Sequence, residues 1–344
     1  MTQEEGRRWP LASPGGGLGG RLRESLEDFR VEELRPEPLS GEGEHWILRI
    51  EKRGLTTDQA AQWLAAACGC RREGIGHAGL KDRQGVTVQD LSVHLPGKSL
   101  PSLAPPPGLT LLTVDRHHRK IRPGHLAGNR FVVRLRGVEG ERGRGEEAAA
   151  WLLRHGVPNY FGEQRFGRDG DNAAQGRRLL SGERMPRLDR HQRGILLSAV
   201  RSELFNDVLA ERIRRGWFTR LLPGDVAQLE GRSACFRVED AGVEGERFQR
   251  GEIHPTGPLF GKGLMSPTGE PGALEEAVGG TAAQTLAQLA DAGLEGARRA
   301  LRILPKGFEM AWEGEDLLLR FDLPRGAYAT TLLRELRESE PAAT

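Results

Sequence analysis

The chain has 344 residues, of which 37% are hydrophobic and 28% are charged. One hydrophobic core seldom serves more than about 250 to 300 residues, so this length excludes a single small module and predicts two domains. No segment approaches the roughly 18 successive apolar residues that a membrane-spanning helix needs, and the N-terminus lacks the apolar core of a signal peptide. We therefore expect a globular, cytoplasmic protein with no membrane association.

The three cysteines are consistent with that compartment. Cys68 and Cys70 share one C-G-C segment and Cys235 stands alone. This set offers neither a disulfide framework nor the paired C-x-x-C spacing of a zinc site. We expect three free thiols.

Basic residues are concentrated in two places, although the net charge is only +2. Of the 50 basic residues 44 are arginine, whose planar fork of donors suits phosphate. Residues 116–122 hold four basic residues, His117 and His118 and no acid, and residues 165–193 hold eight arginines against four acids. Such clusters predict a polyanion-binding face, although the solvated surface of an arginine-rich protein would look the same.

The N-terminal part of the chain alternates in the manner of strands. Residues 1–25 are rich in glycine and arginine without an apolar period, which predicts a flexible tail. From Phe29 onward, residues 29–32 and 46–50 alternate between apolar and polar side chains, as strands do. Thr56 and Gln59 have the spacing of a capping box, and they begin a helix that should end before Gly69.

A glycine-bounded loop is predicted next. Two short apolar segments flank A-G-L-K-D-R-Q-G at 78–85, which places Lys81 and Asp82 on a loop between strands. A further strand is expected at 131–135. A helix is expected at 146–155, closed by Gly156.

From about residue 156 the chain becomes arginine-rich and mainly helical. The clearest helix is predicted at 195–215, and the last one at 297–303 before Pro305. The remaining segment offers one strand at 317–323 and one helix at about 328–338, too little for a core of its own. We therefore expect a first domain made of 26–155 plus 305–344, interrupted by a second domain at 156–304.

The sharpest candidate for chemistry is Asp82 on that loop. A carboxylate on a tight turn beside the charge of Lys81 can stay ionised and be presented clear of the strands, as a nucleophile or general base requires. A solvated Lys-Asp pair on a turn is the more frequent meaning of this pattern.

Aromatic and amide side chains form a second candidate set. Asn129 and Phe131 begin a strand in G-N-R-F; an amide can read the edge of a uracil, and an aromatic ring can hold an unstacked base. The alternative places Phe131 in the core and Asn129 in a turn. Phe29 and Tyr328 are open to the same two interpretations.

Other chemistries lack their sequence motifs. The chain has no P-loop, no H-E-x-x-H and no G-x-S-x-G. The run G-G-G-L-G-G at 15–20 does not follow a strand and open a helix, so it does not predict a dinucleotide site. His117 and His118 are adjacent, which is not the spacing of helical metal ligands.

Seven segments, in the same order as in the family, resemble the TruD-type tRNA pseudouridine synthases. They are E-D-F-R-V-E-E at 27–33, G-E-G-E-H at 41–45, A-G-L-K-D-R-Q-G-V-T-V-Q at 78–89, G-N-R-F at 128–131, V-P-N-Y-F-G-E-Q-R-F-G at 157–167, S-A-V-R-S-E-L-F-N at 198–206 and L-P-R-G-A-Y-A-T-T-L-L-R-E-L at 323–336. The resemblance covers roughly residues 29 to 336.

The resemblance implies the isomerisation of uridine to pseudouridine in tRNA, at position thirteen of the D arm, without a cofactor or metal. It implies Asp82 as the nucleophile, and it places four side chains near the target base: Phe29, Asn129, Phe131 and Tyr328. The implied partner is tRNA, with no obligate protein partner. The implied fold is α+β: a pseudouridine synthase catalytic domain with a mixed or antiparallel sheet, interrupted by an inserted TRUD-type α/β domain.

Further matches and departures accompany the resemblance. Lys81 and Gln89 match the family and are expected to hold the aspartate loop, whereas the matching Glu33 has no assigned role. The family often has alanine where Gly85 stands and phenylalanine where Tyr328 stands.

Two other functions remain open at this point. The same scaffold could serve a non-catalytic tRNA-binding or RNA-folding protein. A metal-dependent nuclease that uses Asp82 and Glu33 is the third hypothesis.

Overall fold

The computed structural model describes residues 9–338, and in it the chain forms two compact units. The first, here called the sheet unit, consists of residues 18–140 and 305–326. The second, here called the helix unit, consists of the other described residues: 9–17, 141–304 and 327–338. None of the helices in the described chain is long and apolar enough to cross a membrane.

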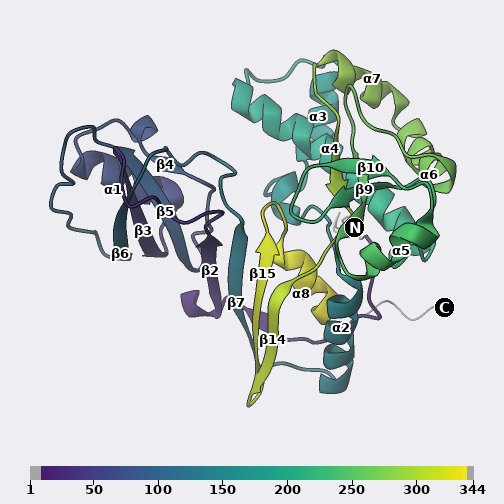
Figure 1. Cartoon of the computed structure of the whole chain (residues 1–344), viewed down its shortest axis with the longest axis horizontal. Coiled ribbons are helices and arrows are strands. Elements are labelled where there is room, and N and C mark those ends of the chain that lie inside the picture. The colour runs from purple at the N-terminus through teal and green to yellow at the C-terminus, as the bar shows by residue number, and fades with distance from the viewer. Residues whose placement is uncertain (1–8, 339–344) are drawn as a thin grey trace. The chain divides into compact units, whose positions relative to one another are not determined.

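A nine-stranded mixed sheet dominates the sheet unit (Figure 1). Its order is β14-β15-β7-β2-β5-β3-β6, with β1 beside β7 and β4 beside β5. Strands β2 and β5 are parallel, and the other paired strands are antiparallel. The strands are β1 (Arg21–Leu22), β2 (Phe29–Leu34), β3 (His45–Arg53), β4 (Gly76–His77), β5 (Val86–His94), β6 (Leu109–His117), β7 (Gly128–Arg136), β14 (Lys306–Glu313) and β15 (Asp316–Pro324). The predicted fold class, α+β with a mixed sheet, is confirmed.

Helix α1 (Thr57–Ala67) covers one face of this sheet. The predicted capping box is present, because the Thr56 side chain accepts from the backbone of Gln59 and the Gln59 side chain accepts from the backbone of Thr56. Leu64 packs with Leu48 and Leu91 in a core between the helix and strands β3 and β5. The alternation in these strands thus turns their apolar face toward α1.

Residues 9–25 are packed, whereas the sequence predicted a flexible tail; residues 1–8 lie outside the described part. Leu18 is fully buried, and β1 pairs with β7. The glycine run permits close approach here: a Cβ on Gly16 would lie 2.3 Å from the carbonyl oxygen of Leu336. Glycine therefore serves packing in this segment rather than mobility.

Seven α-helices and two small sheets are described in the helix unit. The helices are α2 (Arg142–His155), α3 (Asn172–Leu180), α4 (Arg190–Arg214), α5 (Ala241–Gln249), α6 (Gly269–Gly280), α7 (Ala283–Asp291) and α8 (Ala329–Arg337). The strands are β8 (Val157–Pro158), β9 (Val226–Leu229), β10 (Cys235–Arg237), β11 (Ile253–Leu259), β12 (Ala297–Ala300) and β13 (Arg302–Ile303). They form the sheets β10-β9-β11-β12 and β13-β8. The buried side of α4, including Phe205 and Leu209, packs against Tyr160 and Phe161.

Several elements differ from the sequence prediction. The segment 297–303 was expected to be a helix and instead forms β12 and β13, which pair with β11 and β8. Its alanines, arginines and Leu301 are good helix formers, but strand pairing across the fold overrides this local preference. Strand β14 was not predicted, because it is a largely exposed strand at the sheet edge with a weak apolar pattern.

The predicted domain boundaries at 155 and 305 stay a prediction. By packing, α2 and α8 belong to the helix unit, whereas those boundaries would assign both helices to the first domain.

Candidate active site

Asp82 lies on the loop between β4 and β5, as the sequence predicted. Its side chain is 38% exposed and forms an ion pair with Arg23, with 3.1 Å between Arg23 Nη2 and Asp82 Oδ2. The same guanidinium lies over the ring of Phe29, 4.1 Å from its centroid. Arg23 therefore connects the candidate nucleophile to one of the predicted base-contacting rings.

The backbone of Arg23 is strained. Its φ angle is 60°, and it is the one non-glycine residue with a positive φ in the described part of the chain. Such a conformation costs of order 1 kcal/mol and persists where the surroundings enforce it. The structure thus holds this cation in place beside Asp82.

Lys81 turns to Glu33 rather than supplying the charge beside Asp82. Lys81 Nζ lies 3.1 Å from Glu33 Oε2, and both side chains are buried. Burial raises the pKa of Glu33, and the charge of Lys81 opposes that effect. The pair ties the aspartate loop to β2, which gives Glu33 a structural place that the sequence left open.

A buried lysine from β3 holds the backbone of the loop. Lys52 is fully buried, and its ammonium group donates to the carbonyl oxygens of Lys81 at 3.1 Å, Asp82 at 2.9 Å and Leu55 at 2.8 Å. Burial is the main cause that lowers its pKa from 10.5 to about 8. Two of its three acceptors belong to the candidate catalytic segment itself.

A second tie fixes the loop from α1. The Lys81 backbone N–H donates to the Thr57 hydroxyl at 2.9 Å, and that hydroxyl donates to Gln89 Oε1 at 2.9 Å. Gln89 and Thr57 are both buried. This relay matches the expectation that Gln89 helps to hold the aspartate loop.

Phe29, Asn129 and Phe131 share one face of the sheet. In the register of β2 and β7, Val31 lies opposite Phe131 and Glu33 opposite Asn129. The rings of Phe29 and Phe131 meet edge to face with centroids 6.2 Å apart, and their residues are 4% and 7% exposed. The rings are therefore also part of the core. The side-chain oxygen of Asn129 is buried and lacks a hydrogen-bond partner, so it can accept one from a ligand.

Gly85 allows the loop to approach β2. A Cβ at this position would lie 2.5 Å from the carbonyl oxygen of Phe29. An alanine at this position would therefore require the loop or Phe29 to shift.

Tyr328 belongs to the helix unit, where it precedes α8. Its half-buried ring meets Phe161 edge to face with centroids 6.3 Å apart. Gly162 makes room for it, because a Cβ there would lie 3.0 Å from Tyr328 Cδ1. The sheet unit thus brings together four of the five predicted site residues, and Tyr328 has its own aromatic setting in the other unit.

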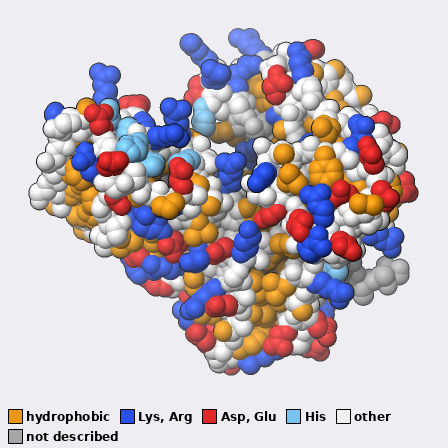
Figure 2. Space-filling view, in the orientation of Figure 1, with side chains coloured by type: hydrophobic (Ala, Val, Ile, Leu, Met, Phe, Trp, Pro, Cys, Tyr) orange, Lys and Arg blue, Asp and Glu red, His pale blue; other side chains and the backbone are white. Residues whose placement is uncertain are grey.

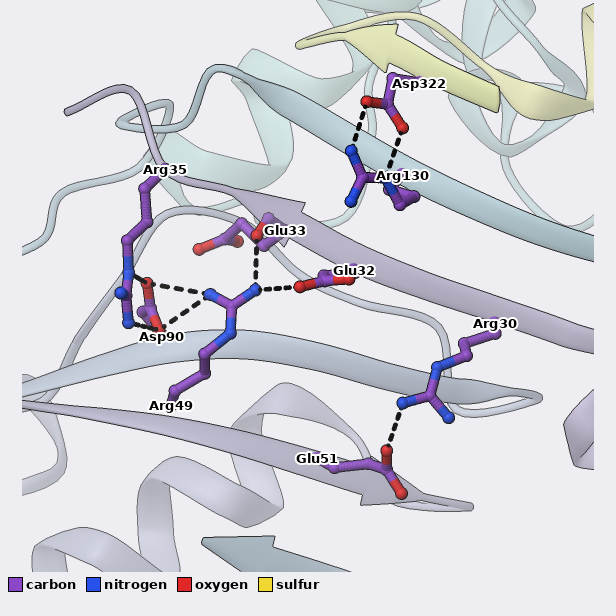
Figure 3. A network of polar contacts seen from close by, with 9 residues as sticks. All are labelled: Arg30, Glu32, Glu33, Arg35, Arg49, Glu51, Asp90, Arg130 and Asp322. Atoms are coloured by element: carbon purple, nitrogen blue, oxygen red, sulfur yellow. Dashed lines mark hydrogen bonds and ion pairs between the residues drawn. The ribbon is translucent and has the colours of Figure 1, made fainter. Parts of the chain in front are cut away.

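A network of ion pairs on the opposite sheet face connects the strands that carry the site (Figure 3). The buried carboxylate of Asp90 accepts two hydrogen bonds from Arg35, at 2.6 and 3.0 Å, and lies 3.3 Å from Arg49. Arg49 also pairs with Glu32 at 2.7 Å. These contacts join β2, β3 and β5, and they support the strands from which Glu33, Lys52 and Gln89 project to the other face.

Metal binding has no evident place in the described residues. No group of three histidine, cysteine, aspartate or glutamate side chains between residues 9 and 338 is arranged to hold a metal ion. The nuclease hypothesis needed Glu33 as a ligand, but its carboxylate is paired with Lys81.

Arg23 and Lys52 were not among the site residues predicted from the sequence. Lys52 was detectable, because it occupies the same strand face as Leu48 and Ile50, where an apolar residue is expected. Arg23 had no local signal, since it lies 59 residues from Asp82 in a segment expected to be mobile.

Comparison with solved structures defines the class of the fold. The crystal structure of a protein from Methanosarcina mazei, assigned to tRNA pseudouridine synthase D (TruD), superimposes with a TM-score of 0.76 over 95% of each chain. At 23% sequence identity this match shows a shared fold.

Comparison of sequences identifies the family. The family profile described as tRNA pseudouridine synthase D (TruD) matches residues 10–185 and 182–336. The tRNA pseudouridine synthase D of Hydrogenovibrio crunogenus is 42% identical over 92% of both chains, and that of Anaeromyxobacter dehalogenans is 43% identical over 94% of both. The chain therefore belongs to the tRNA pseudouridine synthase D family.

Proposed function

We propose that this protein isomerises uridine to pseudouridine in tRNA, at position thirteen of the D arm, with Asp82 as the nucleophile. One observation supports this role above the others. Asp82 presents a partly exposed carboxylate, while Lys52 and Thr57 hold the backbone of its loop from two sides. Positioned reacting groups of this kind remove much of the entropic cost of catalysis.

The reaction requires few groups from the protein. The bond between C1′ and N1 breaks, the uracil turns within the site, C5 joins C1′, and the hydrogen on C5 leaves as a proton while N1 takes up a proton. Redox chemistry and group donors have no part in this balance. Asp82 can act by attack on C1′, by assisting loss of the 2′ proton, or by addition to C6, and the proposal covers all three routes.

The base must leave its stack before it can react. Extrusion of a nucleotide costs a few kcal/mol, and stacking on an aromatic side chain returns about 1 to 3 kcal/mol per base. Phe29, Phe131 and Tyr328 are the proposed rings, and the Asn129 oxygen is the proposed acceptor for a uracil N–H. Because Phe29 and Phe131 are buried, we expect Arg23 to shift from the Phe29 ring when the base binds.

Release of tritium from C5-labelled uridine in tRNA tests the proposal. The turnover rate of the Asp82→Asn variant should be lower by at least about 10³-fold, because an amide is neither a nucleophile nor a base near neutral pH. Asp58→Asn is the matched control, since it makes the same change at an exposed side chain of α1 in the same unit, where Asp58 pairs with Arg72. Its turnover should equal that of the wild type.

Three results would contradict parts of the proposal. Normal turnover by Asp82→Asn would exclude Asp82 as nucleophile. Mapping at single-nucleotide resolution would exclude position thirteen if it located the pseudouridine at another nucleotide. Binding of tRNA by the wild type without any tritium release would favour the non-catalytic alternative.

A further inference from the structure

The segment N-Y-F-G-E-Q-R-F-G at 159–167 carries a second group of aromatic and basic side chains. It lies in the helix unit and is locked to α4 at Asn206, which is fully buried. The Phe161 N–H donates to Asn206 Oδ1 at 2.8 Å, and Asn206 Nδ2 donates to the Phe161 oxygen at 3.0 Å. These two hydrogen bonds fix the position of Phe161.

Arginine side chains converge on that ring. The guanidinium of Arg299 lies 4.1 Å from the Phe161 centroid, and that of Arg165 lies 5.4 Å from it. Arg201 precedes Ser202 on α4, the residue whose hydroxyl accepts from Arg165, and burial together with the charge of Arg165 lowers the pKa of Arg201. Arg165 and Arg299 therefore both lie at the Phe161 ring, and Arg201 lies next to the residue that holds Arg165.

Neutral oxygens position these arginines. Arg165 Nε donates to the Ser202 hydroxyl at 3.0 Å, and Arg201 donates to the carbonyl oxygens of Leu259 and Glu295, both at 2.8 Å. Within residues 9–338, neither Arg165 nor Arg201 has a carboxylate within 4.0 Å, and the Nε of Arg201 is buried without a partner.

Other buried arginines of the helix unit have different partners. Arg212 and Arg298 each pair with a buried carboxylate, Asp225 at 2.7 Å and Glu275 at 2.6 Å. Arg302 shows that neutral acceptors can satisfy a single buried guanidinium. Arg165 and Arg201 differ because their like charges lie close together with neutral oxygens as their polar partners among the described residues, and that arrangement is unfavourable until an anion joins it.

We propose that Arg165, Arg201 and Arg299 form a binding site for a backbone phosphate of the substrate RNA. Guanidinium forks match the oxygens of a phosphodiester, and Phe161 offers them a flat surface that keeps their edges available. The half-buried Tyr328 ring lies beside Phe161, so a phosphate here would place its nucleotide near Tyr328. The choice of RNA as the ligand rests on the proposed function, in which tRNA is the substrate.

Direct binding of unmodified tRNA, measured without turnover, tests this site. Arg165→Gln should weaken tRNA binding about tenfold and reduce the slope of log K against log[salt] by about one, because one phosphate contact is lost. In turnover assays KM should rise more than kcat falls. Arg165→Lys keeps a charge without the fork and should give an intermediate affinity.

Arg215→Gln is the matched control. Arg215 follows α4 directly, carries the same charge and pairs with Glu211 at 2.9 Å on the surface. This variant should bind tRNA like the wild type. Melting temperatures of the variants should agree within a few degrees, because Arg165 has a single polar side-chain partner among the described residues, Ser202.

Competition with inorganic phosphate shows whether the ligand of the site is the RNA backbone or a free phosphate ion. At equal ionic strength, phosphate should compete with tRNA more strongly than chloride does on the wild type, and equally on Arg165→Gln. The proposal is overturned if Arg165→Gln matches Arg215→Gln in affinity and salt slope, or if phosphate binds while tRNA affinity is indifferent to Arg165. Because these are binding measurements, they stay interpretable even if the wild type releases no tritium.

Discussion

Lys52 shows how one residue can position a catalytic loop without touching the substrate. Its ammonium group donates to three carbonyl oxygens, two of them in the Lys81-Asp82 segment. A protonated amine has three hydrogens to offer and a neutral amine has two. The protonation state of Lys52 therefore determines whether every one of these carbonyls keeps its donor.

Replacement of Lys52 by methionine should lower kcat by about ten- to a hundredfold. The change leaves three carbonyl oxygens without their donor, at a cost of about 1 to 3 kcal/mol for each that stays buried, and it allows Asp82 to move from its reacting position. Tritium release at saturating tRNA measures kcat, and tRNA affinity should change little. Equal kcat in both proteins would contradict the positioning role.

The pH dependence of kcat in the wild type should show the titration of Lys52. Burial lowers the Lys52 pKa to about 8, so kcat should fall as pH rises through about 8, and the Lys52→Met variant should lack this step. Stability should move the opposite way: between about 8 and the ordinary value of 10.5 the unfolded chain holds a proton that the folded chain has lost. Unfolding free energy relative to Lys52→Met should therefore rise over this interval. Parallel decline of both quantities would indicate unfolding instead.

At the scale of elements, the start of α1 serves two purposes through adjacent threonines. Thr56 caps the helix, with its side chain accepting from the Gln59 N–H at 3.1 Å. Thr57, the next residue, accepts from the Lys81 N–H and donates to Gln89. One helical turn thus begins the helix and anchors the aspartate loop.

This pair allows a matched comparison of stability with activity. Thr56→Ala should cost about 1 kcal/mol of stability through the lost cap and leave kcat unchanged. Thr57→Val has nearly the same shape as threonine, but it leaves the Lys81 N–H and Gln89 without their buried partner, and it should lower both stability, by about 1 to 3 kcal/mol, and kcat. Urea unfolding and tritium release give the two quantities. A similar kcat for both variants would contradict the anchoring role of Thr57.

Across the whole molecule the distribution of charge matters more than the net value of +2. Four exposed arginines of the 165–193 cluster have no carboxylate within 4.0 Å in the described chain: Arg184, Arg187, Arg190 and Arg193. Figure 2 shows basic side chains projecting at the top of the view, where Figure 1 places the connection between α3 and α4. In the 116–122 cluster, Arg116 is also exposed and lies over the Trp46 ring.

Affinity for tRNA should therefore fall steeply with salt, since each neutralised phosphate releases counterions. Replacing the four exposed arginines by glutamine should weaken binding and reduce the log–log slope by about three to four. Removing four arginines that already pair on the surface should change it little; these are Arg178, Arg214, Arg215 and Arg250. A flat salt dependence of the wild type would argue against both clusters as RNA contacts.

Local patterns in the sequence determined several features of this protein. The capping box at Thr56, the loop that carries Asp82 and the strand alternation that begins at Phe29 each depend on residues a few positions apart, where periodicity and turn chemistry act directly. The motifs were also sufficient for the family, which the relatives confirm. The roles of the motif residues stay part of the proposed function.

Tertiary structure alone decided which charges meet. Arg23 reaches Asp82 from a segment that resembled a tail, and Lys81 turns to Glu33. The helix-forming sequence at 297–303 becomes strands because β11 and β8 offer it pairing partners. These outcomes depend on contacts between distant segments, whose competing partners are set by chain topology and burial, and no window of a few residues contains that information.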